Sequence, residues 1–407
     1  GHTKKYGYNA LSLPVLMQDA EGGETLLTYD ALKRLVKVTT AEGGSETYTY
    51  DGTGNQTGYT DGEGNTRTAA YDSMNRLVKE ILPNGGENSY TYDMAGSLLS
   101  ETDALGNVTS YENNLHGQPV KRILPNGAEY TYTYDRLGRL TGQAASQGLS
   151  QSYTYDSAGN LVKETDQSGR ETAYEYDVMG QLTSAADALG QKTEYYYDDA
   201  GNLTGTRSPM GYTASYSYDR LGRLIRQEDG CGRTETYAYD KAGNLVSSMV
   251  NGEHETVYDY DGNGNLTRET NALGISVKYS YDAMNRLTGV TDGNGGRTSY
   301  AYDHNSRLTA ITDPLGGTTS FAYDGDGNLT GFTDGEGRSA AYTYDLAGHL
   351  IYARTGAEGT GEEKTAAYTY DGIGNVTSST DGNGNETAYT YDLLGNITEK
   401  TNGLGKK

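Results

Sequence analysis

The amino-acid sequence predicts an all-β protein built from tandem β-hairpins. A tyrosine-rich stretch, typified by residues 153–161, recurs every 21 residues from Tyr8 to Tyr344 and resumes at Tyr370 after an insertion of five residues. The chain holds 19 such repeats, 17 of which begin their first turn with Tyr-Asp, and no segment combines helical periodicity with helix caps. Repetition at a fixed period of this size marks a repeat architecture. We expect residues 1–407 to form a single array in one domain.

The first turn of each repeat follows the Tyr-Asp dipeptide. Counting this tyrosine as position 1, position 2 is nearly always Asp, whose side chain can cap the turn that it starts. Position 5 is Gly in most repeats, and Gly tolerates the left-handed backbone region. The exceptions at position 5 are Ser12, Lys33, Asn75, Asn285 and Ser306. We expect a type I turn closed by a left-handed residue at position 5.

A second turn is expected ten residues later. Position 12 is often Asp, and position 15 is Gly in nearly every repeat. Four of the six prolines stand at position 13, where a type I turn requires a φ near −65°; they are Pro83, Pro125, Pro209 and Pro314.

Two short strands lie between these turns. In the strand that ends at Tyr176, alternation places Thr172, Tyr174 and Tyr176 on one face, as in a half-buried strand. An odd period of 21 requires either one odd and one even loop or a β-bulge in every repeat. We favour the first solution, in which Leu161 stands opposite both Tyr155 and Tyr174 and the apolar face is a ladder of Tyr, Leu and Tyr.

The composition limits the classes of partner. The net charge of −23 disfavours binding to nucleic acid or to anionic membrane surfaces. No apolar run approaches the ~18 residues of a membrane span, and a single cysteine excludes a disulfide framework. A hydrophobic fraction of 34% is low, but 39 tyrosines at fixed positions supply large rings for burial.

Some features depart from the regular pattern. Pro14 and Pro119 replace the strand leucine in the first and sixth repeats, where we expect a distorted or edge strand. The insertion near residues 356–361 is expected to be a longer surface loop. No signal peptide is recognisable at the N-terminus, and Gly1-His2 resembles the remnant of a cleaved tag. Since both ends lie inside the array, we expect the chain to be part of a longer protein.

The unit Tyr-Asp-x-x-Gly-Asn/Arg-Leu, as in residues 134–140 and 218–224, resembles the YD repeat of the Rhs family over essentially the whole chain. The resemblance implies a long antiparallel sheet coiled into a spiral or hollow shell. In bacterial polymorphic toxins and insecticidal toxin complexes such a shell encloses a C-terminal toxin. Related repeats occur in wall-associated proteins and in the teneurins of animals. No toxin-like segment follows the repeats in this sequence.

Calcium binding is the strongest chemical hypothesis. Three turns cluster oxygen ligands as the start of a calcium loop does, although each lacks the Gly at position 6 of an EF-hand. The same residues are explained by turn geometry alone. They are Asp261, Asn263, Asn265, Asp324, Asp326, Asn328, Asp381, Asn383 and Asn385.

Other reactive residues favour no enzyme. The histidines occupy different repeat positions without a Ser or Cys at a recognisable spacing, and Cys231 lies in a second turn with only Arg233 nearby. Asp313-Pro314 faintly resembles the cleavage segment of Rhs proteins but stands in register as an ordinary second turn. We expect no catalytic residues, no cofactor and no self-cleavage.

The sequence therefore favours a structural, non-enzymatic protein that encloses or scaffolds a protein cargo, such as a toxin domain absent from this chain. The alternative is a cell-surface array for adhesion or carbohydrate binding, since Tyr, Asn and Asp can stack on sugars and bind their hydroxyls. Either role places the parent protein outside the cell or at its surface. Open strands at both ends of the array also predict some edge-to-edge self-association.

Overall fold

The computed structural model describes residues 3–356 and 363–405, and these contain 38 β-strands and no helix. Contacts divide the chain into two compact units. Unit 1 comprises Gly1–Glu129, Asp261–Asn265 and Tyr279–Lys407, and unit 2 comprises Tyr130–Tyr260 and Leu266–Lys278. Since the described part holds no helix, it also holds none long and apolar enough to cross a membrane.

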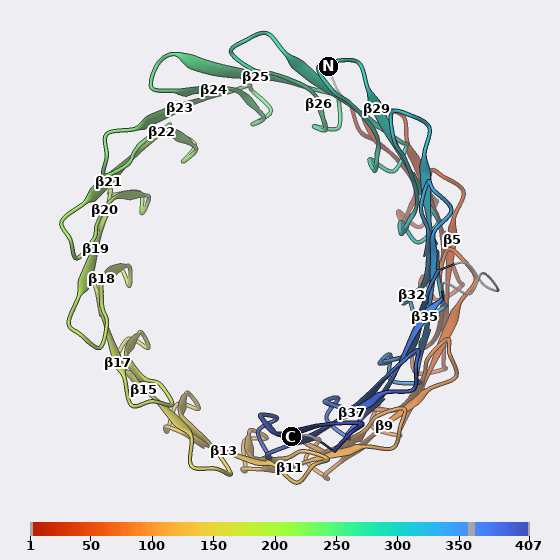
Figure 1. Cartoon of the computed structure of the whole chain (residues 1–407). Helices are drawn as coiled ribbons and strands as arrows, with labels where there is room; N and C mark the ends of the chain where they lie inside the picture. The colour runs from red at the N-terminus through yellow and green to blue at the C-terminus, as the bar shows by residue number, and fades with distance from the viewer. Residues whose placement is uncertain (1–2, 357–362, 406–407) are drawn as a thin grey trace. The chain divides into compact units, whose positions relative to one another are not determined.

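Unit 1 contains two runs of strands (Figure 1). The first run is β1 (Lys5–Tyr8), β2 (Pro14–Gln18), β3 (Glu24–Tyr29), β4 (Leu35–Thr39), β5 (Ser45–Tyr50), β6 (Gln56–Thr60), β7 (Thr66–Tyr71), β8 (Leu77–Ile81), β9 (Glu87–Tyr92), β10 (Leu98–Thr102), β11 (Val108–Asn113) and β12 (Pro119–Ile123). The second is β28 (Leu287–Thr291), β29 (Arg297–Tyr302), β30 (Leu308–Thr312), β31 (Thr318–Tyr323), β32 (Leu329–Thr333), β33 (Ser339–Tyr344), β34 (Leu350–Thr355), β35 (Lys364–Tyr370), β36 (Val376–Asp381), β37 (Glu386–Tyr391) and β38 (Ile397–Asn402).

Unit 2 contains the strands from β14 to β26, and β13 (Glu129–Tyr134) and β27 (Ser276–Tyr281) each begin in one unit and end in the other. The bounds in unit 2 are β14 (Leu140–Ala145), β15 (Ser150–Tyr155), β16 (Leu161–Thr165), β17 (Glu171–Tyr176), β18 (Leu182–Ala186), β19 (Lys192–Tyr197), β20 (Leu203–Arg207), β21 (Thr213–Tyr218), β22 (Leu224–Glu228), β23 (Thr234–Tyr239), β24 (Leu245–Val250), β25 (His254–Tyr260) and β26 (Leu266–Thr270).

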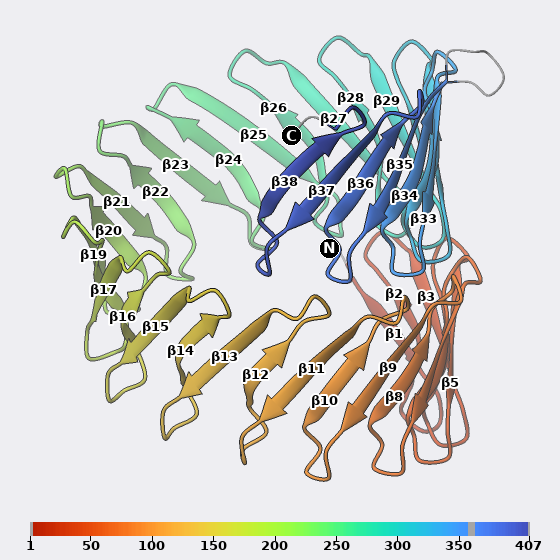
Figure 2. The same ribbon diagram turned by 60° about the horizontal axis from the view of Figure 1, so that its bottom comes forward.

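Within each unit, neighbouring strands of a run pair antiparallel, as Figure 2 shows for the orange strands β8–β12. In the first-turn hairpin β15–β16, Tyr155 stands opposite Leu161 as expected. The register then shifts by one residue between Thr154 and Tyr155, and the same bulge follows the first turns of the next three repeats. The bulge, rather than an even second loop, is what accommodates the odd period.

The expected ladder of Tyr, Leu and Tyr is therefore wrong. In the second-turn hairpin β16–β17, Lys163 pairs with Ala173 and Glu164 pairs with Thr172, without a shift in register. Tyr174 instead pairs with Ala185 of β18 and donates its hydroxyl to Glu164 at 2.7 Å. The Tyr174 hydroxyl thus reaches diagonally to a carboxylate of the preceding strand.

The left-handed residue at position 5 is confirmed in every kind of repeat. Gly159 has a φ of +99°, Asn285 a φ of +62° and Lys33 a φ of +65°. The preceding Asp caps the turn, because Oδ1 of Asp156 accepts the backbone N–H of Asn160 at 2.9 Å. The turn geometry is strict enough to force a lysine, which has no intrinsic preference for this region, into φ > 0.

Pro119, the strand proline of the sixth repeat, distorts its strand less than expected. Pro119 is the first residue of β12 and pairs with Asn113 in the register of the other first turns. A proline at the first position of a strand removes no ladder donor that the sheet needs. Asn113, in place of the usual tyrosine, donates its Nδ2 to the carbonyl of Leu98 at 2.7 Å. The prediction of a distorted strand at this repeat is wrong.

Burial in this sheet is shared rather than concentrated in a core. Among the described residues, the buried ones are all small, and no large side chain is fully buried; they are Ala128, Ala340, Thr109, Ser184, Gly44, Gly86, Gly205 and Gly289. Strand β17 alternates exposed and half-buried residues, with Thr172, Tyr174 and Tyr176 on the half-buried face as expected. Apolar burial is therefore spread over many half-buried tyrosines, each contributing part of its area.

The tyrosine at position 1 also links consecutive repeats. The hydroxyl of Tyr176 donates to the carbonyl of Leu161, 15 residues earlier, at 3.0 Å, and the hydroxyl of Tyr218 donates to that of Leu203 at 2.8 Å. The same bond recurs along the array. Asn113 makes the equivalent bond in the repeat without this tyrosine, which indicates that the bond is a structural requirement of the fold.

The predicted insertion lies between β34 and β35, and residues 357–361 of it fall outside the described residues. The predicted all-β architecture of tandem antiparallel hairpins is confirmed. Its coiling is visible inside unit 1, where the second turns of the first run lie against the first turns of the second run (Figure 2). The sheet therefore covers one of its own edges.

Candidate functional site

The main candidate site is the line of contacts between these two runs, which we call the seam. It joins the second turns of residues 19–128 to the first turns of residues 261–395, all within unit 1. The glutamates at position 14 of three consecutive repeats accept the backbone N–H at position 3 of three later turns. These pairs are Glu21 with Gly262 at 2.6 Å, Glu42 with Ala283 at 3.1 Å and Glu63 with His304 at 2.7 Å.

A second set of contacts joins position 4 of the later turns to position 12 of the earlier ones. Asn263 donates its Nδ2 to Asp19 at 2.8 Å, and Asn305 donates its Nδ2 to Asp61 at 2.6 Å. Burial raises the pKa of Asp61, but the hydrogen bonds from Asn65 and Asn305 outweigh it, and the net pKa is lowered. Hydrogen-bond donors in the seam thus favour the ionised form of Asp19 and Asp61.

Further along the seam, asparagines replace the glutamates at position 14. Asn84 donates its Nδ2 to the carbonyl of Leu346 at 3.2 Å, and Asn126 donates its Nδ2 to that of Leu393 at 3.1 Å. The close approach depends on small residues, since a Cβ added to Gly86 would lie 2.9 Å from the carbonyl oxygen of Leu346. The seam therefore combines backbone contacts with side-chain caps at successive repeats.

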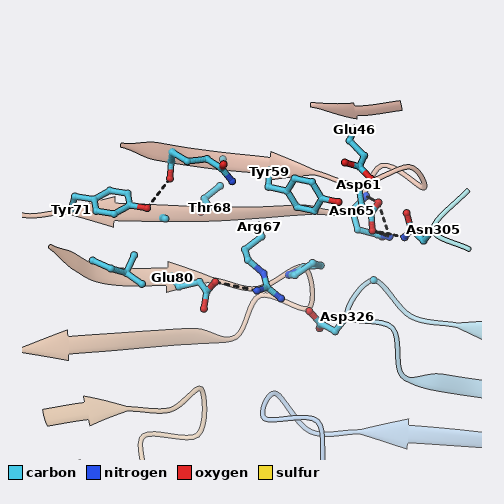
Figure 3. A pocket seen from close by; sticks show the side chains of 16 residues that line it. Glu46, Tyr59, Asp61, Asn65, Arg67, Thr68, Tyr71, Glu80, Asn305 and Asp326 are labelled. Carbon is cyan, nitrogen blue, oxygen red and sulfur yellow. Dashed lines mark hydrogen bonds and ion pairs between the residues drawn. The ribbon is translucent and has the colours of Figure 1, made fainter. Parts of the chain in front are cut away.

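A cavity of about 580 Å³ opens beside the seam (Figure 3). Tyr59 of β6, Arg67 of β7 and Glu80 of β8 form its wall, and Asp326 enters from the first turn that follows β31. Nη1 of Arg67 lies 3.3 Å from Oε1 of Glu80. With Glu46 and Asp61 also present, carboxylates outnumber the single guanidinium. The cavity is acidic and has one aromatic wall.

Asp326 is the unusual group in this cavity. Its Oδ2 accepts the backbone N–H of Asn84 at 3.1 Å, whereas Oδ1 is buried and has no hydrogen-bond partner among the described residues. Burial raises the pKa of Asp326, and the nearby charge of Asp324 adds to this effect. This carboxylate is the least satisfied one of the cavity.

The structure assigns the predicted calcium-binding residues chiefly to turn capping. Oδ1 of Asp261 accepts the N–H of Asn263 at 2.9 Å, and Oδ2 accepts Nδ2 of Asn265 at 2.8 Å. Asp324 accepts hydrogen bonds from Asp326 and Asn328 in the same way, and Asp381 accepts them from Asn383 and Asn385. In each turn the first carboxylate is held by its own loop.

These contacts use the oxygens that a cation would need. The described residues contain no group of three or more His, Cys, Asp or Glu side chains that could hold a metal ion. Asn263 serves the seam, where it contacts Asp19 and Asn285. Calcium binding stays a hypothesis of the sequence pattern, and turn geometry accounts for the same residues without it.

The remaining reactive residues are dispersed. Cys231 is exposed in its second turn. Asp313 caps the turn that contains Pro314, accepting the N–H of Leu315 at 2.8 Å and that of Gly317 at 2.9 Å, as expected for an ordinary second turn. His349 bonds Asp345 and stacks on Tyr370 at 4.9 Å between ring centroids. Among the histidines that the structure describes, His304, which is paired with Glu63, is the one that belongs to the seam.

The sequence analysis missed the role of position 6. Nε of Arg139 pairs with Asp135 at 2.6 Å, its Nη1 donates to the carbonyl of Asp156 at 3.1 Å, and its guanidinium lies 4.7 Å from the ring centroid of Tyr155. Equivalent arginines stack on the next tyrosine in five other repeats. The recurrence of Arg one residue after position 5 was the available signal.

Comparisons with known proteins agree with this architecture. The family described as Teneurin YD-shell matches residues 16–160, 103–239 and 151–334, and the family described as RHS Repeat matches residues 323–360 and 370–407. A comparison with curated proteins gives no match.

Solved structures with a similar fold include three crystal structures that contain TcdB2-TccC3. The TcdB2-TccC3-TEV structure matches with a TM-score of 0.63 at 18% identity and covers 98% of this chain and 26% of that one. The structures of TcdB2-TccC3-Cdc42 and of TcdB2-TccC3 each match with a TM-score of 0.59, at 17% and 16% identity, and each covers 98% of this chain and 28% of that one. This chain thus spans about a quarter of the length of the proteins that it resembles. From the repeat unit, its bulged hairpin and these family matches, the chain belongs to the Rhs/YD-repeat family.

Proposed function

We propose that this chain is a segment of shell wall that encloses a protein cargo, such as a toxin or effector domain absent from the chain. The observation that carries the proposal is the seam. A shell wall retains a folded or unfolded polypeptide only if its adjacent layers leave no gaps. The two runs of strands in unit 1 are two such layers, and the seam joins them at successive repeats. The fold shared with toxin-complex components supports the same role.

A wall of this kind needs no catalytic group. Its carboxylates serve as turn caps and seam acceptors, as Asp156 and Glu63 do. We therefore propose a structural and non-enzymatic protein whose parent is secreted or displayed at the cell surface, as enclosure of an exported cargo requires.

Protease protection tests the enclosure. A protease-sensitive reporter fused behind the repeats should be digested more slowly than the same reporter alone. Substituting Arg for Glu42 and Glu63 together should open the seam and restore digestion. Glu336→Arg is the matched control, because Glu336 also occupies position 14 but lies outside the seam, where it pairs with the exposed Arg338. Equal digestion of fused and free reporter would overturn the proposal.

Carbohydrate binding is the second candidate, and the acidic cavity beside the seam favours it. An aromatic ring and several carboxylates around about 580 Å³ suit a sugar, which stacks on the ring and donates hydroxyls to the oxygens. A glycan panel should then show binding that Tyr59→Ala abolishes and that Tyr352→Ala, an exposed tyrosine elsewhere, leaves unchanged. Absence of binding to any glycan would remove this candidate.

A further inference from the structure

Unit 1 has two edges that take no part in the seam. One consists of the first turns of residues 9–118, and we call it the free first-turn edge. The other consists of the second turns of residues 292–405 that the structure describes, and we call it the free second-turn edge. They are the two kinds of edge that join in the seam, where second turns pack on first turns. Each copy of the chain therefore carries both halves of an interface whose intramolecular version is already formed.

Exposure of apolar residues at position 3 distinguishes the seam from the free first-turn edge. Leu346 and Leu393, at position 3 in the seam, are 43% and 40% exposed. Met94 and Leu115, at the same position of the free first-turn edge, are 97% and 103% exposed. Docking of a second-turn edge is what lowers the exposure, so these two residues present apolar area that an equivalent partner would cover.

The second turns show the same contrast at position 14. Leu105 of the seam is 43% exposed, whereas Leu315 and Leu404 of the free second-turn edge are 97% and 84% exposed. Leu105 lies between the turns of Asn84 and Asn126, both of which contact the second run. Positions 3 and 14, which face each other in the seam, thus carry exposed apolar residues on the two free edges.

The polar groups of the two edges are also complementary. In the seam, the N–H groups at position 3 are accepted by glutamates. The corresponding N–H groups of Ala31, Gly52 and Ser73 on the free first-turn edge make no hydrogen bond to the described residues. On the free second-turn edge, Glu336 occupies the position of the seam glutamates and is exposed. An acceptor and its donors are both present.

Close approach is possible as well. The seam depends on glycines such as Gly23, Gly44 and Gly86 at position 16. Gly296 and Gly317 keep that position small on the free second-turn edge, and a Cβ there would meet only residues of its own or the adjacent turn. The surface that a partner would meet therefore has the profile of the seam.

We propose that the free first-turn edge of one copy docks the free second-turn edge of a second copy through the contacts of the seam. The two surfaces differ, so the interface is heterologous and adds copies head to tail. The net charge of −23 opposes the approach of copies, and salt screens this repulsion. Association should therefore increase with both protein concentration and ionic strength.

Sedimentation velocity on the full chain and two edge variants tests the proposal. Met94→Glu/Leu115→Glu blocks the free first-turn edge, and Leu315→Glu/Leu404→Glu blocks the free second-turn edge. Because all four side chains are exposed, the variants should keep the circular dichroism and thermal unfolding of the parent chain. The parent chain should form species beyond dimers as concentration rises, and each variant alone should stay monomeric.

Mixing the two variants gives the deciding observation. Each retains the edge that the other lacks, so an equimolar mixture should form a one-to-one dimer and nothing larger. A parent chain that stays monomeric up to its solubility limit would overturn the proposal. So would variants that associate as the parent does, since association would then run through the strand edges of the sheet.

Discussion

Glu63 and His304 lie 241 residues apart in the chain, yet Oε1 of Glu63 accepts the backbone N–H of His304 at 2.7 Å. The ring Nδ1 of His304 lies 3.0 Å from the same oxygen. This pair is one of three with the same separation of 241 residues along the chain. In the other two, Glu21 and Glu42 accept the backbone N–H groups of Gly262 and Ala283. The Glu63 carboxylate thus caps the turn that contains His304 and joins the two runs of strands in unit 1.

Removal of this carboxylate should weaken the seam locally. Glu63→Ala deprives the His304 amide of a charged acceptor, at a cost of about 1–2 kcal/mol for a hydrogen bond to a charged group that is partly exposed to solvent. Hydrogen exchange followed by mass spectrometry should show faster exchange in residues 303–307. Glu336→Ala, at the same repeat position but outside the seam, should leave that segment unchanged, and equal protection in the two variants would contradict the role of Glu63.

Steric fit at the seam gives a sharper contrast. A Cβ on Gly23 would overlap the carbonyl oxygen of Ala283, so Gly23→Ala forces the layers apart and should destabilise unit 1 by about 1–3 kcal/mol. Gly52 has no atom near its Cβ direction and no left-handed φ. Gly52→Ala should therefore be neutral or stabilising by a few tenths of a kcal/mol. Urea unfolding of both variants checks the difference, and a neutral Gly23→Ala would show that the layers yield at this point.

The position-1 hydroxyl should matter more than the hydroxyl two residues before it. Tyr176→Phe removes the bond to the Leu161 carbonyl and should cost about 1 kcal/mol. Tyr216→Phe alters the position at which another repeat already carries Phe321, and its effect should be smaller. Thermal unfolding midpoints would rank the two, and the reverse order would remove the hydroxyl from the list of structural requirements.

Acid should destabilise the array through its turn caps. Hydrogen bonds from Asn55 lower the pKa of Asp51 from its ordinary value of 3.8 to about 2, and Asp156 and Asp198 shift in the same direction for the same reason. A carboxyl whose folded pKa is depressed stabilises the fold above its unfolded pKa, and this contribution is lost as the pH falls towards the folded pKa. The urea midpoint should therefore decline between about pH 4 and pH 2.

Asp51→Asn provides the control for this pH dependence. Asn occupies the same position naturally at Asn114, where its Oδ1 accepts the N–H of Gln118 at 3.1 Å. The variant should keep the turn and show a shallower decline in acid than the parent. An urea midpoint that does not change over this range would mean that the caps do not couple folding to protonation.

Local features of the fold were predictable because each is specified within one repeat. The left-handed position 5 follows from Gly and Asn, and it holds even at Lys33. The pairing of Tyr155 with Leu161 follows from the length of the first loop. The bulge could have been chosen over an even second loop, since both turns carry the same Asp-x-x-Gly pattern and should have loops of equal length.

The seam was not predictable for a different reason. Whether Glu63 meets His304 depends on how many repeats separate the two layers, and this number follows from small twists summed over the intervening strands. No single repeat encodes it. The cavity beside Asp326 was equally invisible, because it forms only where two distant turns come together. The available signal in the sequence was glutamate at position 14 in three successive repeats, a pattern that no contact within a single repeat explains.

The equal spacing of the seam pairs has a consequence for how such arrays evolve. Loss of one complete repeat between the layers would bring Glu63 opposite Gly325, which holds the position of His304 in the next turn. Copy number can therefore drift in whole repeats while the lost partners of the three seam glutamates are replaced by their paralogues. Deletion of residues 177–197, one complete repeat, should accordingly yield a folded protein with a shifted seam. Deletion of residues 177–186 removes a single strand, so first and second turns would exchange edges in the rest of the chain, and this variant should not form the seam. Duplication and loss, the usual accidents of repetitive genes, are thus buffered by the fold itself.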